Sequence, residues 1–207
     1  MFAKPFQMIT SLENSILVSY DVAFIDKQKS QKIFNLFEEK LIYNSGEQSQ
    51  VVIMGKKINI PRSQVAYGNP KIKYTFSGTT VQAKDWNESS KVCEYIRYIK
   101  DKVCKRFHCD FNYVLINRYN DGNQYIGYHS DDEKDLCEDS PIVGVSFGST
   151  REISFKHKEK NITKKLMLSD GSAYCMYYPT NKKWKHSILK GKNINYPRIS
   201  LTFRKMV

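Results

Sequence analysis

Long hydrophobic runs are absent from this sequence. Nowhere in its 207 residues does a stretch approach the roughly 20 apolar residues that a membrane-spanning helix requires. The first residues, from Met1 to Phe6, also lack the basic start and apolar core of a secretory signal peptide. We therefore expect a soluble protein without a membrane partner.

The few cysteines do not have the number or spacing of a disulfide framework or of a structural zinc site. The chain has five cysteines, an odd number, and no two of them stand in CxxC spacing. A disulfide framework uses an even set, and a structural zinc site uses closely spaced pairs. The pattern favours reduced thiols, so we expect the protein in the nucleus or the cytoplasm. Internal repeats, low-complexity tracts and linkers rich in Pro or Gly are also absent, and the length fits one domain.

Acidic residues are in deficit. There are 21 Asp and Glu against 33 Lys and Arg, which gives a formal net charge of +12. The basic residues are denser in residues 156–165 and 182–192. They are either solvated surface lysines or the footprint of a polyanionic partner, and charge alone cannot choose DNA over RNA.

Hydrophobic periodicity predicts two helices followed by many strands. Apolar residues at helical spacing favour helices over residues 30–43 and 88–107, and a strand is expected before them at 15–25. A hairpin is expected at residues 50–60 around Gly55, and a further strand at 71–77. Strands are then expected at 112–119, 125–129, 142–148, 152–157, 165–169, 172–178, 185–189 and 199–205. This order predicts an α+β, mostly β, protein with a double-stranded β-helix (jelly roll) core and N-terminal helices packed outside.

Two histidines and one aspartate form a candidate metal site. His129 and Asp131 are two residues apart, so they point to the same side of an extended strand. With the remote His186 they supply the donors of the facial triad that holds non-haem Fe(II). His108 and His157 have no such context, and we expect them to be structural.

The C-terminal strand has one polar and one apolar side. Arg198 and Arg204 are six residues apart and share a side with Ser200 and Thr202, while the residues between them are apolar. The two guanidinium groups can bind opposite ends of a short dicarboxylate. Asn117 and Tyr119 also share a strand side and offer donors to a carboxylate, although a turn-flanking Asn and a core Tyr are the ordinary alternatives.

As a whole, the sequence resembles the AlkB family of Fe(II)- and 2-oxoglutarate-dependent nucleic-acid dealkylases. It is most similar to the animal members that repair alkylated duplex DNA. The resemblance runs from about Val51 to the end and implies an N-terminal strand-helix extension over residues 1–50 and an AlkB-like domain with nucleotide-recognition hairpins over residues 51–207. It rests on ordered blocks at residues 61–64, 67–68, 74–78, 115–119, 129–133, 145–148, 179–181 and 201–205.

The resemblance implies Fe(II), 2-oxoglutarate and O₂ as cofactors. It places the iron, and with it catalysis, on His129, Asp131 and His186. It implies that Arg198 and Tyr119 bind the distal carboxylate of 2-oxoglutarate. The carboxylate beside the iron would contact Asn117 and Arg204, and Thr202 belongs to the same site.

The resemblance also implies a set of substrate-binding residues. Met54 stands where duplex-acting relatives have an aromatic residue that fills the hole left by a flipped base, and methionine is a known intercalating wedge. Carboxylates after the iron ligand favour positively charged methylated bases over neutral ones. The expected substrate-binding residues are Met54, Arg62, Tyr74, Phe76, Ser77, Asp132 and Glu133. For Tyr74 and Phe76 ordinary core packing is the alternative, and for Asp132 an ion pair with Arg204.

The implied function is an oxidative demethylase for N-alkylated DNA bases such as 1-methyladenine and 3-methylcytosine. It would hydroxylate the methyl group, release formaldehyde and restore the base. The expected partner is alkylated DNA, single- or double-stranded, and the protein is expected to be a monomer. An RNA demethylase of the same family, a non-catalytic nucleic-acid-binding module and an oxygenase for a small metabolite are the alternatives.

Overall fold

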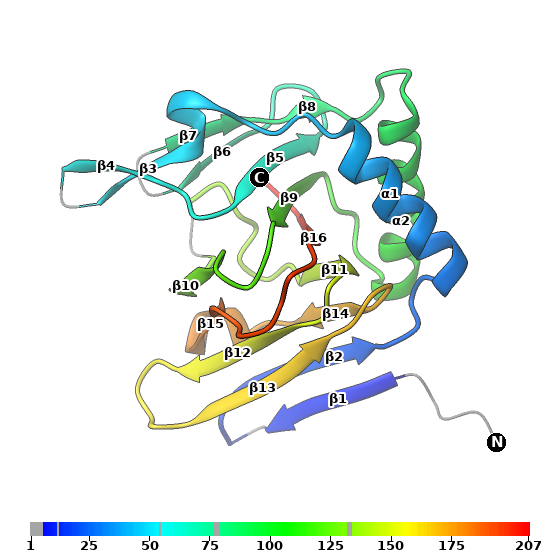
Figure 1. Ribbon diagram of the computed structural model, residues 1–207. Coiled ribbons are helices and arrows are strands. Elements are labelled where there is room, and N and C mark those ends of the chain that lie inside the picture. Colours follow the sequence, from blue (N-terminus) through cyan, green and yellow to red (C-terminus); the bar gives the residue numbers. More distant parts are fainter. Residues whose placement is uncertain (1–5, 12, 54, 77–78, 132–133) are drawn as a thin grey trace.

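The computed structural model describes residues 6–11, 13–53, 55–76, 79–131 and 134–207. Two β-sheets face each other, and the two long helices lie side by side against the outer face of the larger sheet (Figure 1). A double-sheet core with helices outside is the predicted jelly-roll architecture, and the prediction is confirmed.

The larger sheet has eight strands in the described residues. Neighbouring strands are antiparallel except for the last pair. In spatial order they are β1 (Phe6–Ser11), β2 (Ile16–Asp21), β14 (Ala173–Met176), β11 (Ile142–Gly148), β16 (Arg198–Arg204), β9 (Tyr113–Tyr119), β5 (Ser63–Gly68) and β8 (Lys84–Asp85). The N-terminal strands therefore extend the same sheet that carries the C-terminal strand.

A smaller sheet and two hairpins make up the other β-strands of the described residues. The smaller sheet runs β10 (Ile126–His129), β15 (Trp184–Ile188), β12 (Arg151–His157) and β13 (Thr163–Leu168). The hairpins are β3 (Gln50–Ile53) with β4 (Lys56–Asn59) and β6 (Lys73–Phe76) with β7 (Thr79–Gln82). A 3-10 turn, η1 (Gly46–Ser49), precedes β3, and a short helix, α3 (Thr180–Lys183), precedes β15.

Side-chain caps determine where the two long helices begin. Helix α1 (Lys27–Lys40) starts after Asp26, whose Oδ1 accepts a hydrogen bond of 2.9 Å from Lys29 N. Helix α2 (Lys91–Phe107) starts after Ser90, whose Oγ accepts from Cys93 N at 3.1 Å. Such caps satisfy backbone donors that a helix leaves unpaired in its first turn. Both predicted helices exist, with starts shifted by three residues to these caps.

Strand β16 separates the core from a cavity. Ile199, Leu201 and Phe203 are fully buried and belong to the apolar cluster between the larger sheet and the helices. Arg198, Ser200, Thr202 and Arg204 point the other way and line the cavity between the sheets. The predicted alternation of period two is therefore confirmed, and it places two arginines on the cavity wall.

Three further expectations can be compared with the structure. No described helix is long and apolar enough to cross a membrane. All five cysteines are free thiols. His157 is structural, because its Nδ1 accepts hydrogen bonds from the backbone amides of Glu159 and Lys160.

Candidate active site

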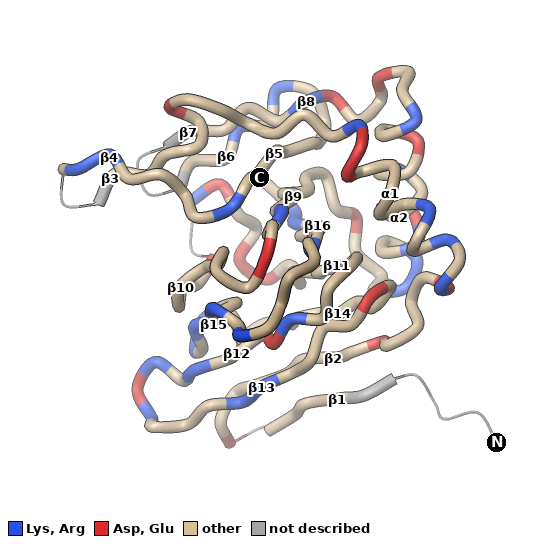
Figure 2. The backbone as a smooth tube through the Cα atoms, in the orientation of Figure 1, with Lys and Arg blue, Asp and Glu red and all other residues tan. Residues whose placement is uncertain are grey.

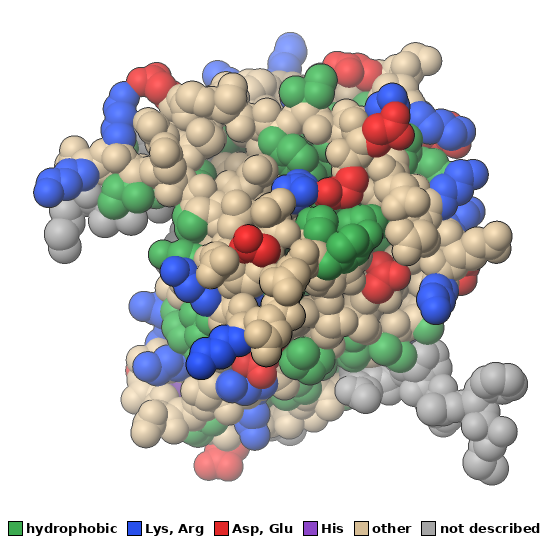
Figure 3. All heavy atoms as spheres, viewed as in Figure 1, with side chains coloured by type: hydrophobic (Ala, Val, Ile, Leu, Met, Phe, Trp, Pro, Cys, Tyr) green, Lys and Arg blue, Asp and Glu red, His purple; other side chains and the backbone are tan. Residues whose placement is uncertain are grey.

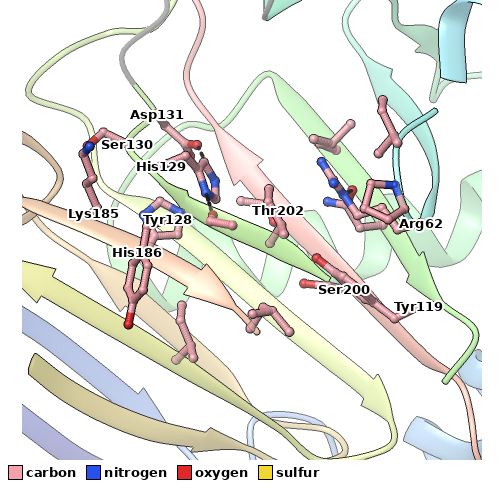
Figure 4. Close-up of a pocket in the computed structure, with 18 of the residues that line it drawn as sticks. Arg62, Tyr119, Tyr128, His129, Ser130, Asp131, Lys185, His186, Ser200 and Thr202 are labelled. Atoms are coloured by element: carbon pink, nitrogen blue, oxygen red, sulfur yellow. Dashed lines mark hydrogen bonds and ion pairs between the residues drawn. The ribbon is translucent and has the colours of Figure 1, made fainter. Parts of the chain in front are cut away.

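His129 and His186 lie directly opposite each other on β10 and β15, with their ring centroids 4.3 Å apart. Asp131 follows two residues after His129, just beyond the end of β10. One ligand atom from each of the three side chains lies within 4.8 Å of the others. Figure 4 shows these three residues together at one end of the cavity. Two imidazoles and one carboxylate at this spacing fit a facial metal site with open positions.

The ring of His129 is oriented for ligation. Its Nδ1 lies 2.9 Å from the carbonyl oxygen of Gly127. Because a carbonyl only accepts, Nδ1 carries the proton and Nε2 keeps its lone pair. Nε2 points to Asp131 and lies 3.6 Å from Oδ1. A histidine whose other nitrogen donates to a backbone carbonyl is the usual arrangement of a metal ligand.

Protonation states also fit a metal site. Burial lowers the pKa of His129, and burial together with the neighbouring His129 lowers the pKa of His186 to about 3. For Asp131, burial raises the pKa, but the charge of Arg204, joined in acid by that of the protonated histidines, outweighs it and holds this pKa well below its ordinary value. The site therefore offers two neutral imidazoles and one carboxylate, which are the forms that bind a metal.

Asp131 is fixed from two directions. Its Oδ2 accepts hydrogen bonds from Arg204 Nε at 3.0 Å and from Arg204 Nη2 at 2.8 Å, and both side chains are buried. Its backbone amide donates to Asn181 Oδ1 at 3.1 Å. Asn181 comes from α3, 50 residues away. Sequence reasoning gave it no role, because an Asn that holds a backbone group leaves no spacing pattern.

Arg198, the first residue of β16, lines the cavity and is buried, with only 1% of its surface exposed. Its Nη2 donates to Ser146 Oγ at 2.9 Å and to Ser200 Oγ at 3.3 Å. Its Nε and Nη1 have no hydrogen-bond partner among the described residues. A buried guanidinium with two unused donors fits a carboxylate ligand, which would supply the missing acceptors and charge. The contact with Ser146 was not predicted.

Asn117 and Arg62 form a polar pair on the neighbouring wall. Arg62 Nε donates to Asn117 Oδ1 at 2.8 Å. Because Arg62 occupies the oxygen, the NH₂ end of the Asn117 amide remains as a donor for a ligand. The buried ring of Tyr119, on the same strand β9, lies 5.5 Å from Arg198 Cζ. Figure 4 shows Tyr119, Ser200 and Thr202 along the wall that leads from Arg62 to the histidines.

The cavity has a volume of about 740 Å³. It brings together most of the predicted site residues: His129, Asp131, His186, Asn117, Tyr119, Arg198, Thr202, Arg204, Arg62 and Tyr74. Tyr74 also has a packing role, because its ring lies 5.4 Å from that of Tyr113 and 5.1 Å from Arg204 Cζ. Phe76 ends β6, and its side chain lies outside the described part. Met54, Ser77, Asp132 and Glu133 also lie outside the described residues.

Comparison with known proteins identifies the family. The sequence profile of the 2OG-Fe(II) oxygenase superfamily matches residues 19–204. This chain belongs to the 2OG-Fe(II) oxygenase superfamily. The AlkB resemblance is confirmed by the DNA oxidative demethylase ALKBH2 of mouse, which is 38% identical over 91% of this chain and 79% of its own length. The human ALKBH2 is 39% identical over 91% of this chain and 73% of its own length.

A solved structure, that of OsALKBH1, has the same fold as this 2OG-Fe(II) oxygenase. It superimposes with a TM-score of 0.57 at 15% identity and covers 97% of this chain and all of its own. Membership of the superfamily establishes Fe(II), 2-oxoglutarate and O₂ as the cofactors. The triad and the unused donors of Arg198 fit the metal and the dicarboxylate.

Proposed function

We propose that this protein is an oxidative demethylase that repairs N-alkylated bases in DNA. The observation that carries the proposal is the cluster of His129, Asp131 and His186 at one end of a cavity whose wall presents the unused donors of Arg198. The similarity to DNA oxidative demethylases over 91% of the chain supports DNA as the substrate. Substrates of the 1-methyladenine and 3-methylcytosine type are positively charged and suit a site with carboxylates nearby.

The proposed roles divide the cavity into two ends. His129, Asp131 and His186 would hold Fe(II), which with O₂ and 2-oxoglutarate supplies the oxidising power for hydroxylating a methyl group. Arg198 and Tyr119 would bind the distal carboxylate of 2-oxoglutarate. Asn117 and Arg204, with Thr202 beside them, would bind the carboxylate nearer the metal. The contact from Arg204 to Asp131 then links the co-substrate to a metal ligand.

The base would enter from the side of the two hairpins. Tyr74 and Arg62 line the cavity there, and Phe76 and Ser77 follow Tyr74 in the sequence. Asp132 and Glu133 follow the metal ligand directly and are proposed to face the methylated base. The β3–β4 hairpin projects from the body of the molecule (Figure 1), and Val52, Lys56 and Lys57 on it are exposed. Met54, which lies between β3 and β4 in the sequence, is the proposed wedge that fills the place of a flipped base.

The smaller sheet offers a surface for the phosphate backbone. Its β12 and β15 bring the two lysine-rich segments together, so that Lys156 lies directly opposite Lys185. Like charges in that position destabilise a sheet, and a bound polyanion relieves the repulsion. Lys158 and Lys185 also line the cavity. Figures 2 and 3 show basic residues in blue over this sheet and at the β3–β4 hairpin.

We also propose an oligomeric state and a compartment for the protein. The protein is proposed to act as a monomer, because the cavity is built from residues of this one chain. The nucleus or the cytoplasm is the proposed compartment, because all five cysteines are free thiols and such compartments keep thiols reduced.

Formaldehyde release from matched oligonucleotides tests the proposal. The protein with Fe(II) and 2-oxoglutarate should release formaldehyde from single- or double-stranded DNA that contains 1-methyladenine or 3-methylcytosine. Unmethylated DNA of the same sequence is the control. Faster release from methylated RNA than from either form of DNA would replace the proposal with an RNA demethylase. Binding of methylated DNA without any formaldehyde would indicate a non-catalytic binding module.

A further inference from the structure

Arg151, at the start of β12, is a buried arginine to which the proposed function gives no role. Only 2% of its surface is exposed, and it has no carboxylate within ion-pair distance among the described residues. Its guanidinium instead donates to three backbone carbonyls: Nη1 to Asp121 at 3.0 Å, and Nη2 to Gln124 at 3.0 Å and to Leu189 at 2.7 Å. A buried charge is costly unless it is hydrogen-bonded, so these three contacts need an explanation.

The three carbonyls belong to two loops whose flanking residues line the cavity. The first loop, residues 120–125, leads from β9 into β10, which carries His129. The second loop, residues 189–197, leads from β15, which carries His186, into β16, which begins with Arg198. Arg151 therefore holds together the two loops that adjoin the strands of both histidines and of the proposed co-substrate arginine.

Backbone contacts show that the two loops meet closely. Gly122 N donates to Ile194 O at 2.8 Å, and Gly191 N donates to Gly122 O at 2.9 Å. A Cβ atom added to Gly122 would lie 2.0 Å from Gly191 O, so a side chain there has no room. The backbones of the two loops pack directly against each other. The buried guanidinium of Arg151 links them further, because it donates hydrogen bonds to carbonyls of both loops.

Arg151 also adds charge to the co-substrate end of the cavity. Its Cζ lies 5.5 Å from the ring of Tyr119, and Arg198 Cζ lies 5.5 Å from the same ring. Two buried guanidinium groups thus share one aromatic ring, and neither has a carboxylate partner in the described residues. An anion bound at Arg198 would lower the electrostatic cost of burying both cations.

We propose that Arg151 is a positioning residue for the dicarboxylate co-substrate: it locks the two loops together and places a second buried positive charge behind Tyr119. This inference rests on the proposed function, in that it takes the Arg198 end of the cavity as the 2-oxoglutarate site. Arg151 does not line the cavity, so it acts through Tyr119 and the loops and not by contact.

The first test measures binding and not turnover. Affinity for 2-oxoglutarate is measured by calorimetry on the full chain loaded with Mn(II) in place of iron. Arg151→Met keeps the volume and removes both the charge and the hydrogen bonds, and it should weaken binding by about tenfold, within the range that residues without ligand contact produce. Arg151→Lys keeps the charge and loses the planar fork, so it should fall between Arg151→Met and the wild type.

Arg118→Met is the matched control. Arg118 precedes Tyr119 on β9 but faces outward, where it forms hydrogen bonds of 2.7 and 2.8 Å with Glu38 on α1. Its loss should lower the melting temperature without changing the affinity for 2-oxoglutarate. Hydrogen exchange at the amides of Gly122 and Gly191 should accelerate in Arg151→Met and stay unchanged in Arg118→Met.

The binding results separate the role of Arg151 from the proposed 2-oxoglutarate site. Wild-type affinity in Arg151→Met, or in Arg151→Lys if the Met variant does not fold, would overturn the inference and leave Arg151 a purely structural residue. Loss of binding in Arg198→Met with unchanged binding in Arg151→Met would also overturn it while supporting the proposed site. If the wild-type protein loaded with Mn(II) does not bind 2-oxoglutarate, it is the proposed function that fails.

Discussion

At the scale of single residues, the pair formed by Asp131 and Arg204 couples the two halves of the site. Both side chains are at least 95% buried, and two hydrogen bonds join them. Asp131 is proposed to ligate the metal, and Arg204 is proposed to bind the nearer carboxylate. The carboxylate of Asp131 therefore joins the proposed metal site to the proposed binding site of the nearer carboxylate.

Because Asp131 is paired with the buried Arg204, we predict that the proposed metal ligands differ in how much they contribute to the free energy of unfolding. Asp131→Ala and His186→Ala should both abolish formaldehyde release, because each removes a ligand. Asp131→Ala also removes the carboxylate against which Arg204 is buried, and it should lower the free energy of unfolding by about 3 to 5 kcal/mol. His186→Ala should cost much less. Urea unfolding of the metal-free proteins checks this, and equal losses in the two variants would contradict it.

At the scale of secondary-structure elements, much of the fold and site could be predicted because one face of a strand is apolar and the other polar. The alternation in residues 198–204 predicted both the core face and the cavity face of β16, and the burial confirms it. Strand β5 was not predicted, because Val65, Ala66 and Tyr67 are all buried and show no alternation.

Other parts of the site have no signal in the sequence. Arg151 binds only backbone carbonyls, and any residue can supply a carbonyl, so its partners cannot be recognised from residue types. Asn181 holds the backbone of Asp131 in the same way. Long-range contacts of side chains with backbone groups become visible only when the fold is known.

The β3–β4 hairpin leads to a prediction about Met54. Removing a base from a duplex costs a few kcal/mol, which a wedge side chain offsets, whereas a single strand has no hole to fill. Met54→Ala should therefore reduce demethylation of duplex DNA far more than that of single strands, and Met54→Phe should keep or improve it. Val52→Ala, an exposed change on the same hairpin, is the control. Equal losses on both substrates, or none, would show that Met54 is not a wedge.

At the scale of the whole molecule, the protein has a net charge of +12. We expect the lysines of the smaller sheet to contribute more to DNA binding than those on other faces. If the smaller sheet meets phosphates, affinity for DNA should fall log-linearly with salt. Replacing Lys156 and Lys185 together by Gln should reduce that slope by about 2, since each neutralised phosphate contributes about 0.9. Replacing Lys27 and Lys32 on α1 removes the same charge from another face and should leave the slope unchanged. Equal slopes in all three proteins, measured by fluorescence anisotropy, would indicate that the lysines are only solvated surface.

The measurement that tests the central claim most directly is the balance of products on one methylated oligonucleotide. Succinate, formaldehyde and the restored base are quantified together by mass spectrometry, with Fe(II) present and after its removal by a chelator. We predict equal amounts of succinate, formaldehyde and restored base with the wild-type protein, and none of the three with His186→Ala or without the metal. Succinate formed without formaldehyde, or formaldehyde released by His186→Ala, would contradict the assignment of this cavity as the site of demethylation.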